Sequence, residues 1–147
     1  MFQRLILVTL VLLFISPLAN ASKPEIYSSI FGGAINGYDP VAYFTQGKPV
    51  KGKRAYRVEY KGASWSFASN KNRQAFKQNP NRYMPQYGGY CAYAVSQGYT
   101  ASTDPNAWSI VNNKLYLNYS KGVRSKWNID RPGYIKKANS NWPKVLK

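Results

Sequence analysis

The feature that most constrains the fold is a pair of segments in which apolar and polar residues alternate on both sides of a short turn. Residues 56–67 alternate around a turn at residues 61–63, and residues 108–119 alternate around Asn112-Asn113. Successive side chains of a β-strand point to opposite faces, so this pattern is typical of half-buried strands. Asparagine tolerates the positive φ of a tight hairpin turn. The sequence therefore predicts two antiparallel β-hairpins.

Helical signals follow each hairpin. Ser69 or Asn70 can cap a short helix that Asn79-Pro80 would end. After Ser120, apolar residues recur at helical spacing on both sides of a proline: Val123, Trp127, Ile135, Ala138 and Trp142. This predicts two short amphipathic helices, or one helix kinked at Pro132, that pack Trp127 and Trp142 onto the sheet. The expected fold class is α+β, a small single domain with two antiparallel hairpins, a short helix and C-terminal helices packed on the sheet.

The N-terminal residues have the pattern of a secretory signal peptide. Arg4 precedes an apolar run over residues 5–15, and small residues at positions 19 and 21 fit a cleavage site. The run is too short for a spanning helix, so we expect an exported, periplasmic protein, with secretion as the alternative, and no transmembrane segment after cleavage. The expected organisation is a signal peptide at 1–21, a linker at 22–36 and a domain at 37–147.

The charge balance indicates which partners the protein attracts. The chain has 21 Lys and Arg residues against 5 Asp and Glu residues, a formal net charge of +16 at pH 7. A positive surface potential favours anionic lipids, glycan phosphates or nucleic acid. The densest basic block lies within residues 48–61. Because an exported protein meets little nucleic acid, we expect an anionic envelope surface rather than a nucleic acid as a candidate partner.

Composition excludes several kinds of chemistry. The chain contains no histidine and one cysteine, Cys91. A Ser-His-Asp triad, a histidine zinc site, an internal disulfide and a CxxC redox motif are therefore excluded. We lean toward a non-enzymatic function and leave a catalytic role for Cys91 open.

A segment rich in glycine and tyrosine, residues 83–93, surrounds the single cysteine. Tandem glycines let a backbone turn tightly or approach a ligand closely. Cys91 is either a small buried hydrophobe in a tyrosine-rich core, or a thiolate that faces a pocket, with Met84 as a thioether partner. The candidate ligand-binding residues are Tyr38, Asp39, Tyr43, Tyr87, Gly88, Gly89, Tyr90, Cys91 and Tyr93.

Asp39 admits three interpretations. It could supply an oxygen ligand, or accept a hydrogen bond from the hydroxyl of Tyr38 or Tyr43, or start a turn with Pro40. We favour the turn, since Asp-Pro pairs commonly begin one.

Several sequence blocks carry a family pattern. They include GYDPVAYF at 37–44, GKPVKG at 47–52, YKGASWSFAS at 60–69, NPNRY at 79–83, GGYCAY at 88–93, DPNAW at 104–108 and LYLNY at 115–119. Together they resemble the YHS-domain proteins, in particular the exported branch often labelled YHS domain-containing (seleno)protein. The resemblance extends from about Asn36 to the C-terminus.

The resemblance implies a metal-binding module, because short YHS domains are taken to bind metals, often copper, through cysteines. At the corresponding positions this chain has Ala42, Ala68 and Asn72, and it lacks the histidine of the family name. The family's own ligand set is therefore not carried over. Since some relatives use selenocysteine, the resemblance implies Cys91 as its sulfur counterpart.

Three functional hypotheses follow. The leading one is a non-enzymatic exported module that binds a soft metal, copper first, or a small ligand in a Gly/Tyr/Cys pocket. Cys91 and Met84 would be the metal ligands, since Cu(I) accepts few, soft ligands whereas zinc needs three or four. The second is a redox-active Cys91 that uses an external resolving thiol. The third is a cationic protein that recognises anionic lipid or glycan through residues 48–61.

Overall fold

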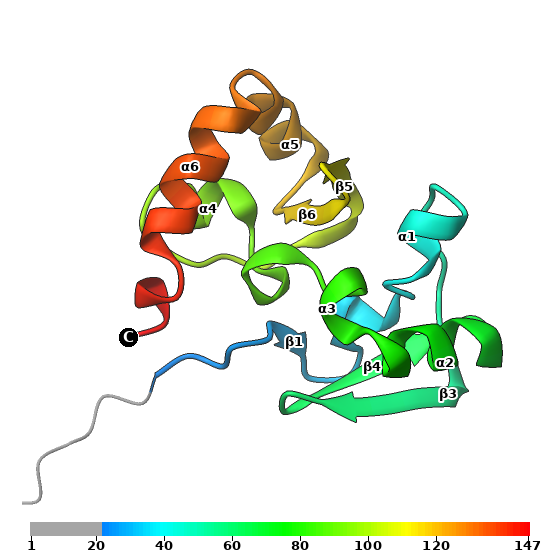
Figure 1. The fold of residues 1–147 in the computed structure, drawn as a ribbon. Helices are drawn as coiled ribbons and strands as arrows, with labels where there is room; N and C mark the ends of the chain where they lie inside the picture. The colour runs from blue at the N-terminus through cyan, green and yellow to red at the C-terminus, as the bar shows by residue number, and fades with distance from the viewer. Residues whose placement is uncertain (1–21) are drawn as a thin grey trace, which may run out of the picture.

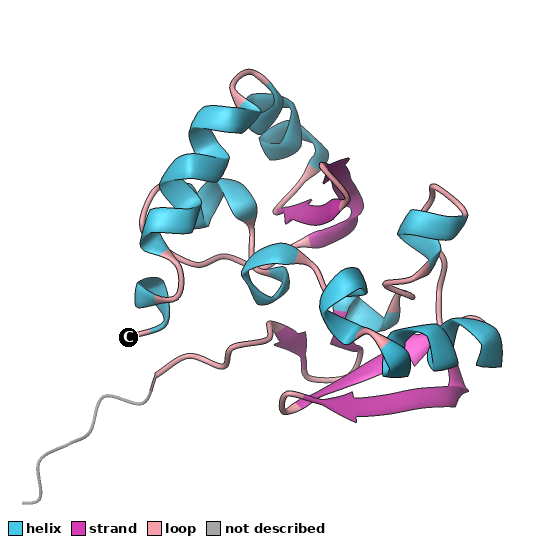
Figure 2. Ribbon diagram, in the orientation of Figure 1, coloured by secondary structure: helices cyan, strands magenta, loops and turns pink. Residues whose placement is uncertain are grey.

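The computed structural model describes residues 22–147, so the predicted signal peptide lies outside the described residues. The described chain forms an α+β domain, as predicted, with antiparallel two-stranded sheets (Figures 1 and 2). The strands are β1 (Ser28–Ser29), β2 (Gly33–Ala34), β3 (Lys53–Tyr60), β4 (Ala63–Phe67), β5 (Asp104–Val111) and β6 (Lys114–Asn118). The α-helices are α1 (Ala42–Thr45), α2 (Asn70–Gln78), α3 (Pro80–Tyr83), α4 (Ala92–Ser96), α5 (Lys121–Asn128) and α6 (Arg131–Asn141). Short 3-10 turns are η1 (Ile35–Gly37), η2 (Gln86–Gly89) and η3 (Lys144–Leu146).

Residues 22–36 are part of the fold and not the linker that the sequence predicted. They form the small β1–β2 hairpin and lead into η1. Ile26 and Ile35 are 4% and 3% exposed and belong to a hydrophobic cluster. The linker prediction was wrong because Gly32-Gly33 indicated a break in structure, whereas Gly32 ends the turn of a hairpin, Gly33 begins β2, and the next residues, Ala34 and Ile35, are buried.

Both predicted hairpins are confirmed. β3 pairs with β4, and β5 pairs with β6. The first turn has φ values of 51° at Lys61 and 73° at Gly62, and the second has 50° at Asn112 and 59° at Asn113. Two consecutive positive φ values are those of a type I′ turn, whose twist matches the right-handed twist of the strands.

The predicted short helix is α2. Ser69 caps it, since its Oγ accepts a hydrogen bond from the backbone N–H of Asn72 at 3.1 Å. Its buried residue Phe76 packs on Trp65 and Phe67 of β4, with ring centroids 5.1 Å away in each case. Pro80 then begins α3, so the helix ends where the sequence predicted.

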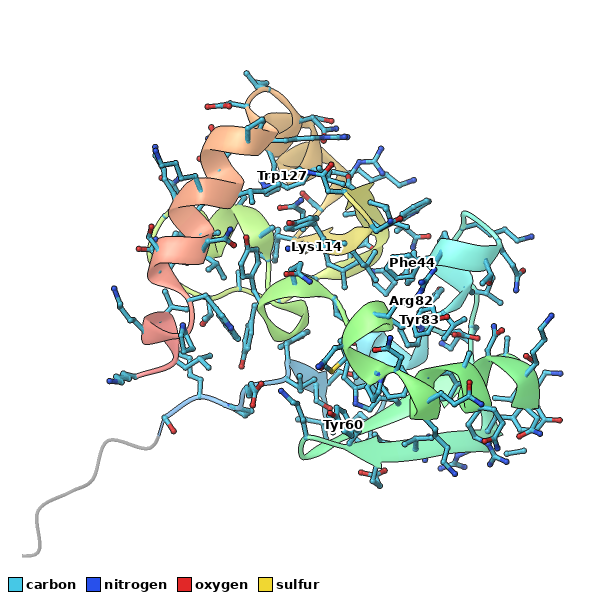
Figure 3. The ribbon with its side chains drawn as sticks, in the orientation of Figure 1. Phe44, Tyr60, Arg82, Tyr83, Lys114 and Trp127 are labelled. Carbon is cyan, nitrogen blue, oxygen red and sulfur yellow. The ribbon has the colours of Figure 1, made fainter. Side chains whose placement is uncertain are left out.

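Helices α1 and α3 were not predicted, and they contact each other through an aromatic pair. The rings of Phe44 and Tyr83 lie edge to face with centroids 5.6 Å apart (Figure 3). α1 and α3 have four residues each, which is too short for a helical repeat to be visible in the sequence.

The C-terminal region forms two separate helices, one of the two predicted alternatives. Ser120 Oγ accepts a hydrogen bond from Val123 N–H at 3.1 Å and caps α5. Asp130 Oδ1 accepts one from Gly133 N–H at 3.0 Å and caps α6. Each helix therefore has its own N-cap, and the non-helical backbone at Asp130 separates α5 from α6, so the chain is not a single kinked helix.

The two tryptophans of this region pack differently. Trp127 is fully buried against Tyr116 of β6, with ring centroids 5.4 Å apart, as predicted. Trp142 instead contacts Tyr87 and Tyr90, at 6.0 and 6.2 Å between centroids. The prediction that Trp142 packs on the sheet was wrong, since this residue follows the last turn of α6 and lies over the Gly/Tyr segment.

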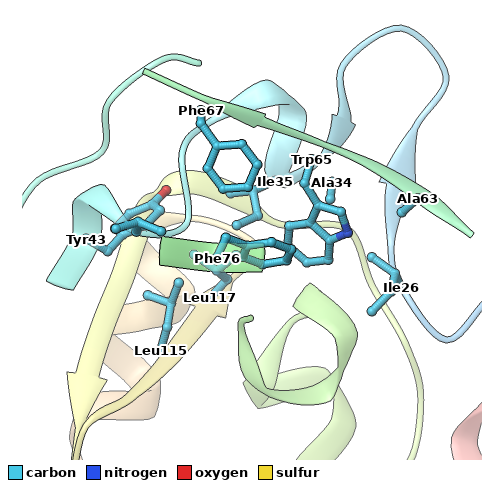
Figure 4. Close-up of a cluster of buried hydrophobic side chains, with 11 residues drawn as sticks. Ile26, Ala34, Ile35, Tyr43, Ala63, Trp65, Phe67, Phe76, Leu115 and Leu117 are labelled. Carbon is cyan, nitrogen blue, oxygen red and sulfur yellow. The ribbon is translucent and has the colours of Figure 1, made fainter. Parts of the chain in front are cut away.

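Strand β6 joins the two hydrophobic clusters of the domain. Leu115 and Leu117 point into the cluster formed by the β3–β4 hairpin and α2 (Figure 4). Tyr116, between them, points into the cluster that contains Trp127 and Ala138. Alternate residues of a strand face opposite sides, so β6 contributes to both cores and makes the two halves one domain.

Among residues 22–147, no helix is both long and apolar enough to cross a bilayer.

Candidate functional site

Asp39 is the most heavily hydrogen-bonded side chain among the residues proposed as ligands. It is fully buried. Its Oδ1 accepts hydrogen bonds from the backbone N–H groups of Val41 and Ala42, at 2.8 and 3.3 Å. Its Oδ2 accepts from the N–H of Ala68 at 2.8 Å and from Nδ2 of Asn72 at 2.7 Å. The carboxylate therefore holds the start of α1, the end of β4 and the first turn of α2 together.

Three of these donors belong to the positions at which the family resemblance places metal-binding cysteines. Ala42, Ala68 and Asn72 come from separate parts of the chain, yet all three contact one carboxylate. Alanine has no ligand atom, and the Asn72 amide donates its Nδ2 proton to Asp39. The side chains of these residues therefore do not provide the ligands of a metal site. The three positions are linked instead by hydrogen bonds to the Asp39 carboxylate.

The two tyrosines beside Asp39 do not bind its carboxylate. The Tyr43 hydroxyl donates a hydrogen bond to the carbonyl oxygen of Pro105 at 2.8 Å. Burial raises the pKa of Tyr43 above its ordinary value, so the phenol remains protonated. The ring of Tyr38 lies under Lys51, whose Nζ is 5.6 Å from the centroid. Asp39 therefore starts a turn, as the sequence analysis favoured.

An open hollow of about 620 Å³ lies beside the Asp39 hydrogen bonds. We call it the lysine hollow, since three lysines and no carboxylate are among its lining residues. These residues are Thr45, Gln46, Val50, Lys51, Lys53, Ala68, Ser69, Lys71 and Asn72.

The N-terminus of α2 contributes to the positive potential of the lysine hollow. Its cap, Ser69, and its first-turn residues Lys71 and Asn72 line the hollow. The first turn contains no acidic residue. A helix N-terminus carries partial positive charge on its free N–H groups, and it adds to the charges of the lysines. The arrangement favours an anion.

The tandem glycines accommodate another part of the chain. A Cβ on Gly88 would come within 1.7 Å of the backbone oxygen of Glu25, and the φ of Gly88 is 60°. The carbonyl oxygen of Gly88 accepts a hydrogen bond from Tyr27 N–H at 2.9 Å. The sequence left open whether a turn or a ligand required glycine here, and the close neighbour is the N-terminal segment of the chain itself.

The tyrosines of this segment also have structural partners. Tyr87 donates its hydroxyl to Oδ1 of Asn139 at 2.9 Å, and Tyr90 donates its hydroxyl to the carbonyl of Pro24 at 2.8 Å. Tyr93 packs against Tyr134 of α6, with ring centroids 5.2 Å apart. These contacts attach the Gly/Tyr segment to the N-terminal segment and to α6.

Cys91 is a buried free thiol, 1% exposed. Its Sγ accepts a hydrogen bond from Tyr119 N–H at 3.3 Å and donates to Oδ1 of Asn118 at 3.6 Å. Burial raises the pKa of the thiol. The protonated form is therefore favoured, whereas metal ligation and nucleophilic attack both need the thiolate.

Met84 lies at a different place from Cys91. It lines a hollow of about 250 Å³ together with Glu25, Tyr87 and Gly88, and Cys91 is not among the lining residues. Within the described residues 22–147, no group of three or more His, Cys, Asp or Glu side chains could hold a metal ion. The structure does not bring the two proposed sulfur ligands to one hollow.

The sequence analysis missed the lysine hollow as a site. Lys51 and Lys53 belong to the basic block at residues 48–61. Lys71 lies after the β3–β4 hairpin, in the first turn of α2. The available signal was the cap Ser69 followed by a lysine in the first helical turn. Sequence spacing alone could not show that this turn faces the basic block.

The fold and site define a small α+β domain with a buried, fully hydrogen-bonded aspartate beside a cationic hollow. Residues 41–87 match the family model of the YHS domain, and the chain therefore contains a YHS domain. This match covers Ala42, Ala68 and Asn72. YHS domains are associated with metal binding in general. No curated protein and no solved structure gives a significant match.

Proposed function

We propose that this chain is an exported, non-enzymatic binding domain that holds a small anionic molecule in the lysine hollow. The ligand class is a phosphate- or carboxylate-bearing molecule. Export rests on the N-terminal sequence pattern. The single observation that carries the ligand class is the convergence of Lys51, Lys53, Lys71 and the N-terminus of α2 on one hollow without a carboxylate.

The electrostatics of the hollow oppose a metal cation and favour an anion. Three lysines and the N-terminal turn of α2, the positive end of its dipole, line the same space. The carboxylate of Asp39, which is bonded to the lining residues Ala68 and Asn72, is fully buried and already accepts four hydrogen bonds. A cation would therefore meet repulsion without a free ligand, whereas a phosphate could be bound by the lysines and by backbone N–H groups.

The copper hypothesis remains a prediction with little structural support. It needs the Cys91 thiolate, but this thiol is 1% exposed and its pKa is raised by burial. It also needs Met84, which lines a separate hollow. The redox hypothesis depends on the same thiol and meets the same obstacle. Both hypotheses require a rearrangement that opens Cys91.

Titration calorimetry at low salt would test the proposal, with inorganic phosphate and pyrophosphate as probes. A Lys53→Gln/Lys71→Gln variant should bind pyrophosphate about tenfold or more weakly, since each lost charge removes an ionic contact. The matched control is Lys77→Gln/Lys121→Gln, which removes the same charge from exposed lysines outside the hollow. The control should retain wild-type affinity. Equal weakening in both variants would show that only net charge matters and would refute the site.

A second titration addresses the copper hypothesis directly. Cu(I) in competition with a chelator should give the same result for the wild-type protein and for Cys91→Ala. A loss of Cu(I) affinity in Cys91→Ala would instead assign the metal to the buried thiol and favour the original hypothesis.

A further inference from the structure

The turn between β1 and β2 exposes two adjacent large apolar side chains. Ile30 is 93% exposed and Phe31 is 95% exposed. Single exposed apolar residues are common on protein surfaces and need no explanation. Ile30 and Phe31 are a different case, because two neighbouring apolar side chains at the tip of one turn are almost completely exposed. The unfavourable contact of apolar surface with water is therefore concentrated at one site.

The structure holds this turn firmly in place. Gly32 N–H donates a hydrogen bond to Oγ of Ser29 at 3.0 Å and closes the turn. A Cβ on Gly33 would come within 2.4 Å of the backbone oxygen of Ser64, so the base of the hairpin lies directly against β4 (Figure 1). The exposure of Ile30 and Phe31 is therefore a property of the fold and not of a loose chain end.

Cationic residues lie on the side of the tip that carries Phe31. Phe31 lines a hollow of about 240 Å³ together with Lys51, Arg54 and Arg57, and no carboxylate is among the lining residues. Neither Glu25, in the N-terminal segment, nor Glu59, on β3, lines this hollow. Glu25 is 2.6 Å from Nζ of Lys61 in an ion pair, and Glu59 is exposed on β3. The balance of charge beside the tip is positive.

We propose that Ile30 and Phe31, with Lys51, Arg54 and Arg57, form a membrane-docking surface that inserts the tip into an anionic lipid bilayer. The apolar pair would enter the boundary between headgroups and acyl chains, and the cations would contact lipid phosphates. This use of the surface is independent of the anion proposed for the lysine hollow, although Lys51 borders both.

A bilayer suits this surface better than a folded protein partner does. A stable protein interface needs a broad complementary surface with a buried apolar centre. The tip offers two apolar side chains and a cationic rim, which a lipid surface can accept without shape complementarity. Net charge alone would let any face of the protein adsorb to an anionic bilayer. The apolar tip would instead fix one orientation of the protein on the bilayer.

Binding to vesicles would test the proposal. The chain that begins at Ser22, after the predicted cleavage site, is used, which keeps the apolar run at 5–15 from contributing. Sedimentation would compare phosphatidylcholine vesicles with and without phosphatidylglycerol. The wild-type chain should bind only the anionic vesicles. An Ile30→Ser/Phe31→Ser variant should bind them about tenfold or more weakly.

The matched control is Ile129→Ser, because Ile129 is 83% exposed at the end of α5, outside this surface. It should bind the anionic vesicles within about twofold of the wild-type chain. In a Phe31→Trp variant, the added emission should shift to the blue with anionic vesicles only. These are exposed sites, so all variants should keep the wild-type unfolding midpoint.

Three outcomes would overturn the proposal. The first is no binding to anionic vesicles. The second is equal binding by the wild-type chain and Ile30→Ser/Phe31→Ser, which would mean adsorption through net charge alone. The third is self-association in sedimentation equilibrium that the double variant abolishes, without vesicle binding, which would assign the tip to an interface between two copies of the chain.

Discussion

Two buried polar clusters, one in each half of the domain, differ in how completely their hydrogen bonds are made. In the first, both oxygens of Asp39 accept two hydrogen bonds each. In the second, Oδ1 of Asn118 accepts hydrogen bonds from Tyr93 N–H and the Cys91 thiol. The Nδ2 of Asn118 is buried without a hydrogen-bond partner.

This difference shows what each cluster can do. The Asp39 cluster occupies the positions of family metal ligands, and any ligand there would have to break hydrogen bonds that hold three elements together. The Asn118 cluster surrounds the only thiol of the chain, but the thiol itself is used as a donor and an acceptor. In both clusters the side chains that the sequence marked as candidate ligands are engaged in hydrogen bonds within the fold, and we propose that the ligand binds instead in the lysine hollow beside the Asp39 cluster.

The largest effect should come from Asp39→Asn, which changes charge and donor pattern with almost no change in shape. One carboxylate oxygen would become an NH₂ group and face other donors, so buried donors would be left unpaired. We expect a loss of about 3 kcal/mol in the free energy of unfolding, measured by urea denaturation.

Glu59→Gln is the matched control for this prediction, since it neutralises an exposed carboxylate. It should cost less than about 0.5 kcal/mol. If Asp39→Asn were equally mild, the hydrogen bonds of Asp39 would not be what stabilises the first half of the domain.

A smaller loss is expected for Asn118→Ala in the second cluster. The substitution removes the acceptor for Tyr93 N–H, but it also removes the unpaired Nδ2. We expect a loss of about 1–2 kcal/mol by the same urea measurement. A loss as large as that of Asp39→Asn would contradict the comparison, because it would mean that Nδ2 also makes a strong hydrogen bond.

A third prediction concerns alkaline pH. Burial raises the pKa of Tyr43 above the ordinary value of 10.0. Its contribution to stability is fully present below pH 10 and is lost as the pH rises further, since the unfolded chain releases a proton that the folded chain retains. Above pH 10, the free energy of unfolding should fall by about 1 kcal/mol per pH unit from this group.

The Tyr43→Phe variant isolates that contribution. It should be less stable at neutral pH by about 1 kcal/mol, because the hydrogen bond to Pro105 is lost, and its alkaline slope should be flatter. Tyr99→Phe, at a tyrosine that is 52% exposed, should keep the wild-type slope. If the free energy of unfolding fell with pH at the same rate in all three proteins, the alkaline loss of stability would come from groups other than Tyr43.

The fold could be predicted where a local pattern is sufficient to determine structure. The turns at Lys61-Gly62 and Asn112-Asn113 need positive φ, and their residues tolerate it. The caps Ser69 and Ser120 likewise act within three residues of the chain. Residues 22–36 were predicted to be a linker, but their structure depends on contacts with residues far away in the sequence, such as that of Gly33 with Ser64.

The candidate site was harder to predict for the same physical reason. The sequence could identify Asp39 and Cys91 as unusual, but their roles depend on partners 33 and 27 positions away, Asn72 and Asn118. The lysine hollow joins residues on both sides of the β3–β4 hairpin. A charge count predicts a basic surface, but only the three-dimensional arrangement shows where the charges converge.

The smallest change in stability is expected for Cys91→Ala, about 1 kcal/mol or less, because a small side chain with one weak donor and one weak acceptor is lost. The thiol of the folded protein should react with iodoacetamide only when the structure opens. The alkylation rate should therefore rise with urea in parallel with unfolding, and the denatured chain should react rapidly. Fast alkylation without denaturant, together with a wild-type unfolding midpoint, would show that the thiol is reached in the native state. In that case the Asn118 cluster, with its unpaired amide, would be a chemical site after all, and the contrast with the Asp39 cluster would become one between a reactive site and a structural one.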